Sequence, residues 1–180
     1  VGATGGAITL QWAQSQQRNS SLTMNTGSFL IAYKVVGADV AEAYFSDDFS
    51  IEAADIVSLS GGASQVEKAT SETNEKTIGV ISTKPGLVLG EADGLGKPVI
   101  VGLAGRVPVK VNDENGPIEP GDAIMASSVP GVGAKAVRSG RVVGKALTAY
   151  NGEGQGHVML FIDNGYWQAP PTFDFAADFD

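Results

Sequence analysis

Residues 37–45 hold the side chains whose types and spacing could do chemistry. Asp39 and Glu42 stand three residues apart there, at the point where an N-terminal arm joins the main body. In a turn or at a short helical start, two such carboxylates can point at one spot, share a proton and do acid–base work on a nearby peptide bond or water. The structural alternative, which the spacing alone favours, is that Asp39 caps a turn and Glu42 completes a capping box.

Residue types exclude most other catalytic and metal chemistry. His157 is the single histidine and there is no cysteine, so we expect no nucleophilic triad, thiolate site, disulfide or transition-metal centre. Asp47–Asp48 and Asp113–Glu114 lack the spacing of a calcium loop and are interpreted as solvated turns. The glycine-rich segment 94–98 has neither a Walker nor a dinucleotide-binding spacing. The sequence therefore predicts no cofactor and no metal.

The charge of the chain limits its partners. Twenty acidic residues against twelve basic ones give a formal net charge of −8 at pH 7. A field of this sign repels phosphate backbones, so nucleic acid is not an expected partner. There is no basic amphipathic stretch, and no apolar run approaches the roughly 18 residues of a membrane span, so membrane insertion is not expected either.

Composition and periodicity predict a mainly β chain with few or no helices. The 24 glycines and 8 prolines place turns every few residues. Residues 1–36 are expected to form an extended β arm, residues 37–165 the main body and residues 166–180 an acidic C-terminal tail. Narrow strands such as those of the arm cannot bury their apolar faces alone. The arm therefore either packs on the main body or takes part in oligomerisation.

The main body contains an internal repeat. The matching segments are Ile51–Val57 with Ile118–Ile124, Lys68–Ala69 with Lys135–Ala136, and Thr77–Ile81 with Val142–Ala146. The offset is 67 residues for the first two pairs (51 to 118, 68 to 135) and 65 for the third (77 to 142), so one loop is two residues shorter. Self-similarity at a fixed period is typical of a duplicated supersecondary unit. The alternative is a chance match among common apolar residues.

Asp55 and Asp122 stand at the same place in the two copies. Pro120–Asp122 reads as a turn, in which Gly121 takes a positive φ and Asp122 bonds to nearby backbone amides. Asp55 follows Ala54 in the same frame. We interpret Asp55, Gly121 and Asp122 as structural turn residues rather than catalytic ones.

Several short motifs, taken in chain order, carry a resemblance to a known family. They are Asp39–Glu42, Gly79–Gly86, Gly105–Val111, Gly121–Asp122 and Gly144–Ala146. Their order and spacing resemble those of the C-terminal intramolecular-chaperone autoprocessing domain of phage neck-appendage tail spikes, and of related domains that end bacterial surface-fibre proteins. The resemblance covers roughly residues 37–162.

This resemblance implies a mainly β, homotrimeric domain at the end of an extended fibre, with residues 1–36 as the end of the shaft. In the phage members the domain helps three chains to align in register and then cuts itself off near its own N-terminal edge. A carboxylate pair of the Asp-x-Ala-Glu kind is implicated in that cleavage. Asp39 and Glu42 are the matching positions, and the cut would fall within residues 36–39. Val40 stands where the phage pattern tends to have an aromatic residue, and Gly37–Ala38 where it has a hydroxyl residue. These departures favour a domain that does not cleave itself.

We therefore carry forward three functions for an extracellular, cell-surface or virion protein. The first is a structural and assembly domain of a fibre or appendage that promotes homo-oligomerisation, with a trimer expected. The second is a self-cleaving intramolecular chaperone, at most a single-turnover autopeptidase that cuts near residues 36–39. The third is a fibre tip that binds a carbohydrate or another surface receptor, for which Tyr166, Trp167 and Phe173 are the candidate aromatic residues. No metabolic activity is expected.

Overall fold

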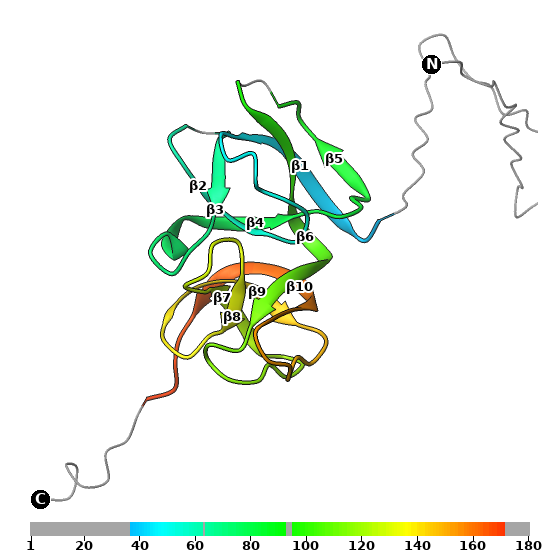
Figure 1. The fold of residues 1–180 in the computed structure, drawn as a ribbon. Helices are drawn as coiled ribbons and strands as arrows, with labels where there is room; N and C mark the ends of the chain where they lie inside the picture. The colour runs from blue at the N-terminus through cyan, green and yellow to red at the C-terminus, as the bar shows by residue number, and fades with distance from the viewer. Residues whose placement is uncertain (1–36, 63, 93–94, 172–180) are drawn as a thin grey trace, which may run out of the picture. The chain divides into compact units, whose positions relative to one another are not determined.

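The structure, a computed structural model, describes residues 37–62, 64–92 and 95–171 (Figure 1). All described residues belong to one compact unit within Lys34–Asp180. The expected arm at 1–36 and the part of the expected tail that holds Phe173 lie outside the described residues.

The described residues form ten strands and one short 3-10 helix. In chain order these are β1 (Asp39–Ser46), β2 (Ile56–Leu59), β3 (Val66–Lys68), η1 (Asn74–Lys76), β4 (Thr77–Ile81), β5 (Leu87–Leu89), β6 (Lys97–Asn112), β7 (Ala123–Ala126), β8 (Gly133–Lys135), β9 (Gly140–Ala146) and β10 (Gln155–Trp167). The prediction of a mainly β fold is confirmed. None of the described helical segments is long and apolar enough to cross a membrane.

The second half of β6 and the strands that follow it close into what we call the C-terminal ring. β6 pairs antiparallel with β10 and parallel with β8, and the circuit is completed by β8–β7, β7–β9 and β9–β10. Every second side chain of a strand points inward, and the inward set fills the ring with buried apolar groups such as Val109, Ile124, Val143 and Leu160. Closure leaves few free strand edges in this half.

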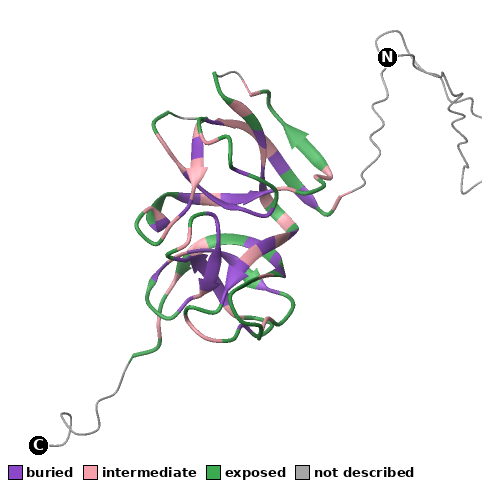
Figure 2. Cartoon of the chain, viewed as in Figure 1, coloured by how far each residue is buried: buried purple, intermediate pink, exposed green. Residues whose placement is uncertain are grey.

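The first half of β6 takes part in a second circuit, the N-terminal ring. β6 pairs with β1 and β4, β4 with β2, and β2 with β3. A bridge between Phe45 and Gln65 closes the circuit between β1 and β3. Its interior holds a separate apolar cluster that includes Ile51, Val57 and Val101. Figure 2 shows the buried positions running along β6, which belongs to both rings.

Several strands of the two rings are related by the offset of the sequence motif. β7 and β8 occupy the positions of β2 and β3 moved by 67 residues (56–59 to 123–126, 66–68 to 133–135), and the end of β9 takes the place of β4. Single hydrogen bonds repeat as well. The amide of Ala69 donates to the carbonyl of Ile56 at 2.9 Å, and the amide of Ala136 donates to that of Ala123 at 2.8 Å. We interpret the two rings as a structural repeat.

One strand extends further than the sequence suggested, and another is short and lies at an edge. β10 continues to Trp167, past residue 165 where the main body was expected to end, because Tyr166 and Trp167 pair with Arg141 and Gly140 of β9. β5 is a short strand at an edge. Among the described residues it pairs with β1 alone, and all three of its side chains are exposed.

Candidate functional site at the start of β1

Asp39 and Glu42 both lie in β1, which is a strand and neither a turn nor a helical start. Asp39 pairs with Gly105 of β6, whereas Glu42 lies between Leu89 of β5 and Val101 of β6. Side chains alternate between the faces of a strand, so residues three apart point to opposite faces. The local geometry that would bring the two carboxylates together is therefore not formed. The alternative of a helical capping box is also wrong, because no helix begins here.

Asp39 faces inward and is almost completely buried. Its side chain belongs to a residue that is 5% exposed, and its Oδ2 atom has no hydrogen-bond partner among the described residues. A Cβ atom at Gly102 would lie 3.2 Å from this oxygen, so the glycine leaves the room that the carboxylate occupies. A buried polar group without a partner costs about 1–3 kcal/mol, which makes such an atom rare unless it serves a purpose.

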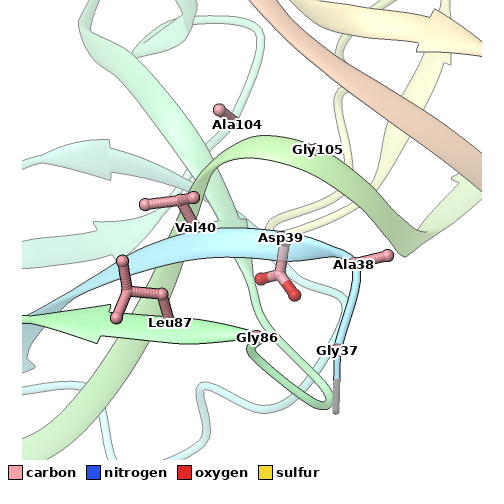
Figure 3. A pocket seen from close by; sticks show the side chains of 8 residues that line it. All are labelled: Gly37, Ala38, Asp39, Val40, Gly86, Leu87, Ala104 and Gly105. Atoms are coloured by element: carbon pink, nitrogen blue, oxygen red, sulfur yellow. The ribbon is translucent and has the colours of Figure 1, made fainter. Parts of the chain in front are cut away.

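The Asp39 side chain lines an open pocket of about 460 Å³ (Figure 3). The carboxylate projects from the start of β1 toward the space beside Gly37 and Gly86. The pocket is otherwise lined by small or apolar residues, namely Gly37, Ala38, Val40, Gly86, Leu87, Ala104 and Gly105. It therefore combines an apolar wall with a single unpaired acceptor.

Backbone contacts fix the segment that enters this pocket. The carbonyl of Ala38 accepts a hydrogen bond from the amide of Arg106 at 3.0 Å, and that of Asp39 accepts one from the amide of Gly86 at 2.9 Å. Gly105 has a φ of +107°, and a Cβ atom there would lie 2.7 Å from the Cα atom of Asp39. A glycine is required at this position because β6 bends against β1. One carboxyl group, and not a pair, is thus held beside the peptide bonds of residues 37–39.

Glu42 has a different environment on the opposite face. Its Oε2 atom accepts a hydrogen bond from the Tyr44 hydroxyl at 3.1 Å. Burial, this hydrogen bond and the nearby charge of Glu42 together raise the pKa of Tyr44. The catalytic roles suggested for Asp39 and Glu42 remain predictions, and the geometry separates them into two independent groups.

Asp55 and Asp122 make the same turn in the two rings. The Oδ2 atom of Asp55 accepts from the amide of Glu52 at 2.9 Å, and that of Asp122 accepts from the amide of Glu119 at 2.8 Å. Gly121 has a φ of +98°, as the turn requires, whereas Ala54 adopts +72° at the matching place. These carboxylates therefore hold backbone donors at the entrance to β2 and β7.

Sequence reasoning missed the cations that pair with these two aspartates. The Nζ atom of Lys110 lies 2.7 Å from Oδ1 of Asp55, and that of Lys68 lies 3.6 Å from its Oδ2. In the other ring, Nζ of Lys135 lies 2.8 Å from Oδ2 of Asp122. Lys68 and Lys135 were recognised as part of the repeat, so their recurrence with the aspartates was the available signal. No local signal marks Lys110, which comes from β6 and reaches Asp55 only in the folded chain.

The remaining candidate residues lie elsewhere. Tyr166 is largely exposed, and it lines a second pocket of about 350 Å³ together with Trp167, Lys145 and Asp163. His157 lies on β10 opposite Lys110. Within the part of the chain that the structure describes, no cluster of histidine and acidic residues could hold a metal ion.

Comparisons with known proteins find similarity at the level of structure. No family model and no curated protein sequence matches the chain. The crystal structure of the bacteriophage phi29 gene product 12 C-terminal fragment is similar over 69% of this chain and 100% of that one, with 22% identity and a TM-score of 0.51. The pre-mature bacteriophage phi29 gene product 12 is similar over 70% of this chain, with 21% identity and a TM-score of 0.52, and the chain spans 21% of its length. The described body thus shares its fold with the C-terminal fragment of a phage protein, in agreement with the resemblance carried by the sequence motifs.

Proposed function

We propose that this chain is a structural and assembly domain of a virion appendage or extracellular fibre, and that it associates with further copies of itself. The observation that carries the proposal is the likeness in fold to the phi29 gene product 12 C-terminal fragment, which extends over the whole of that fragment. A trimer is the expected state because the family that the motifs resemble is trimeric. Its place of action would be the virion or a cell surface.

The geometry of the described residues supports a structural role over turnover of a substrate. The two rings are filled with apolar side chains, and Asp55 and Asp122 each stabilise a turn by accepting a backbone hydrogen bond. Asp39 and Glu42, the carboxylates of interest, face away from each other. The net charge of −8 also argues against a nucleic-acid partner and leaves proteins or neutral sugars as partners.

Sedimentation equilibrium of the complete 180-residue chain tests the proposal of self-association. At micromolar concentration we expect a mass of three times 18.5 kDa. A mass of 18.5 kDa up to concentrations of about 100 µM, in the range where weak but specific protein contacts still form, would contradict it.

A second candidate function is a single self-cleavage within residues 36–39, and the unpaired carboxylate of Asp39 favours it. In this reaction the Asp39 carboxylate would take a proton from water, whose oxygen adds to the preceding carbonyl carbon. The C–N bond then breaks and the leaving amine takes the proton, so the reaction consumes one water molecule and yields two chains. The departures from the phage pattern at Gly37–Ala38 and Val40 make this the second choice.

Mass spectrometry of the intact chain separates the two candidates. After several days at 37 °C and neutral pH, we expect an unchanged mass of 18.5 kDa for the wild type and for Asp39→Asn alike. Fragments that end and begin within residues 36–39 in the wild type, but not in Asp39→Asn, would establish self-cleavage instead. Glu42→Gln is the matched control. Because Glu42 faces the opposite side of β1, this variant should still cleave if Asp39 acts alone.

Binding of a glycan or another surface receptor is a third candidate, and the pocket beneath Tyr166 and Trp167 favours it. Aromatic faces next to a carboxylate such as Asp163 suit the apolar faces and hydroxyl groups of a sugar ring.

A further inference from the structure

Three apolar side chains on the N-terminal ring form an exposed surface that we call the β1–β5 patch. Its members are Val40, Leu87 and Leu89, each between 39% and 47% exposed. Val40 pairs with Leu87 across the two strands, so their side chains lie together. Figure 2 shows β5 as an exposed strand at the border of the sheet. Among the described residues, its outer edge has no partner strand.

A strand of this kind is seldom left uncovered. A free edge with consecutive apolar residues invites pairing or docking, and soluble proteins usually protect such edges with charges, proline or a bulge. The patch is also continuous with the Asp39 pocket, because Val40 and Leu87 line both. The outer surface of the patch therefore extends to the mouth of this pocket, whereas the Asp39 carboxylate itself lies buried on the inner face of β1.

A second exposed apolar surface lies on the C-terminal ring, and we call it the β10 patch. It consists of Leu147, Met159 and Phe161, which are between 39% and 47% exposed. Met159 and Phe161 are on the outer face of β10, since the alternate residues of that strand are buried inside the ring. The amide of Leu147 donates to the carbonyl of Met159 at 2.7 Å, which joins the three residues into one surface.

The two patches carry opposite charges. On the outer face of β1 and β5, Glu42 stands beside Leu89. On the β10 patch, Phe161 lies directly between Arg106 of β6 and Lys145 of β9. Neither of these two cations forms an ion pair with any residue that the structure describes. Two of only twelve basic residues in the chain thus flank one exposed phenylalanine.

We propose that the β1–β5 patch of one copy docks on the β10 patch of the next copy, head to tail. This inference rests on the proposed self-association and names the surfaces that would carry it. Apolar side chains cover each other at the centre, and Arg106 and Lys145 of one copy face Glu42 of the other. Contacts between two different patches generate a ring when the rotation between copies closes.

The observations favour a second copy over a different partner. Copies with a net charge of −8 repel each other over most of their surface, so they can approach closely only where local charges compensate. The two patches offer that compensation within a single chain. Contact of the β1–β5 patch with itself would instead place Glu42 against Glu42, which costs energy.

The test uses the complete chain with one charge placed in each patch. Leu87→Glu alters the β1–β5 patch, and Phe161→Glu alters the β10 patch, where Arg106 and Lys145 allow the isolated monomer to accommodate a glutamate. Val137→Glu, at a residue that is 55% exposed and belongs to neither patch, is the matched control. We expect each patch variant to weaken association by about 30-fold or more, as removal of a central interface residue does, and the control to behave as wild type. Circular dichroism and urea unfolding verify that each variant is folded.

Mixing the two patch variants gives the decisive result. Leu87→Glu chains keep an intact β10 patch and Phe161→Glu chains keep an intact β1–β5 patch, so an equimolar mixture should form a one-to-one dimer that cannot grow or close. A mixture that remains monomeric, or single variants that assemble like the wild type, would overturn the inference while leaving self-association standing. A monomeric wild type would overturn the proposed self-association itself.

Discussion

At the scale of single residues, Asp55 and Asp122 occupy the same place in the two rings but differ in their surroundings. The Asp55 side chain is 1% exposed and contacts two lysines, whereas that of Asp122 is 23% exposed and contacts one. Both carboxylates also accept a backbone amide in their turn. We therefore expect the loss of Asp55 to cost more than the loss of Asp122, because the Asp55 carboxylate is desolvated and holds two lysines, whereas Asp122 remains in contact with solvent.

Replacement of these residues should reveal the difference. We expect Asp55→Asn to lower the free energy of unfolding by about 2–3 kcal/mol, because Lys110 loses its buried partner, and Asp122→Asn by about 1 kcal/mol. Urea denaturation followed by circular dichroism measures both values. Equal losses would show that burial of the ion pair is not what distinguishes the two turns.

Acid should weaken the fold through Asp122. Burial alone would raise the pKa of Asp122, but the hydrogen bonds from Lys135 and from the Glu119 amide, together with the charge of Lys135, bring it below its ordinary value of 3.8. A carboxyl whose pKa is lower in the folded than in the unfolded state stabilises the fold above the unfolded pKa, and this contribution is lost as the pH falls through the folded pKa.

Unfolding free energies measured between pH 6 and pH 2.5 test this sign. The wild type should lose stability more steeply below about pH 4 than Asp122→Asn does, since the variant has no carboxyl to protonate. Glu52 contributes in the same direction, because the hydrogen bond and charge of Lys110 lower its pKa. Parallel curves of unfolding free energy against pH for the wild type and Asp122→Asn would contradict a lowered pKa of Asp122 in the folded state.

At the scale of elements, the end of β10 covers part of the C-terminal ring. Tyr166 and Trp167 pair with β9, and Trp167 packs on a small cluster formed by Ala123, Met125 and Val142. This cluster lies on the outside of the ring, and Trp167 packs against it and shields it from solvent. The strand therefore contributes to stability beyond the residue where the alternating pattern of the sequence ends.

Truncation tests this contribution. A chain that stops after Gly165 should lose about 2 kcal/mol of unfolding free energy, because the apolar area under Trp167 becomes exposed and two strand pairings disappear. A chain that stops after Pro171 keeps every contact described above and is the control. Equal stability of the two truncated chains would show that the last residues of β10 contribute nothing.

The sequence was sufficient to predict structure that depends on neighbouring residues. It was insufficient to predict structure that depends on pairing between strands distant in the chain. The mainly β character could be predicted because glycine and proline turns and alternating apolar residues are local signals. β1 could not be recognised as a strand at Asp39–Glu42, because its conformation is imposed by β5 and β6 on its two sides. The extension of β10 was hidden because the strand pairing shifts between Ile162 and Gly165 and interrupts the alternation.

At the scale of the whole molecule, the acidic surface governs what the protein approaches. With a net charge of −8, the chain should bind an anion-exchange column at pH 7 and pass unretained through heparin or immobilised DNA at about 50 mM salt. Elution profiles on the two columns measure this. Retention on heparin that decreases with salt would show a local basic surface strong enough to bind polyanions. That result would also weaken the argument that copies meet only where the patches compensate their charges.

The strand β6 has a mechanical consequence for a protein whose two ends are pulled. The chain enters the described body at β1 and leaves it after β10, and both strands form their longest ladders with β6. Tension applied between residues 37 and 171 would therefore pass from β1 through β6 into β10, and the intervening loops would carry little of it. Rupture under this tension would therefore begin either where β1 peels from β6 or where the end of β10, Gly165–Trp167, peels from β9. The resistance of the domain to force would then be set by two hydrogen-bonded ladders rather than by its apolar cores.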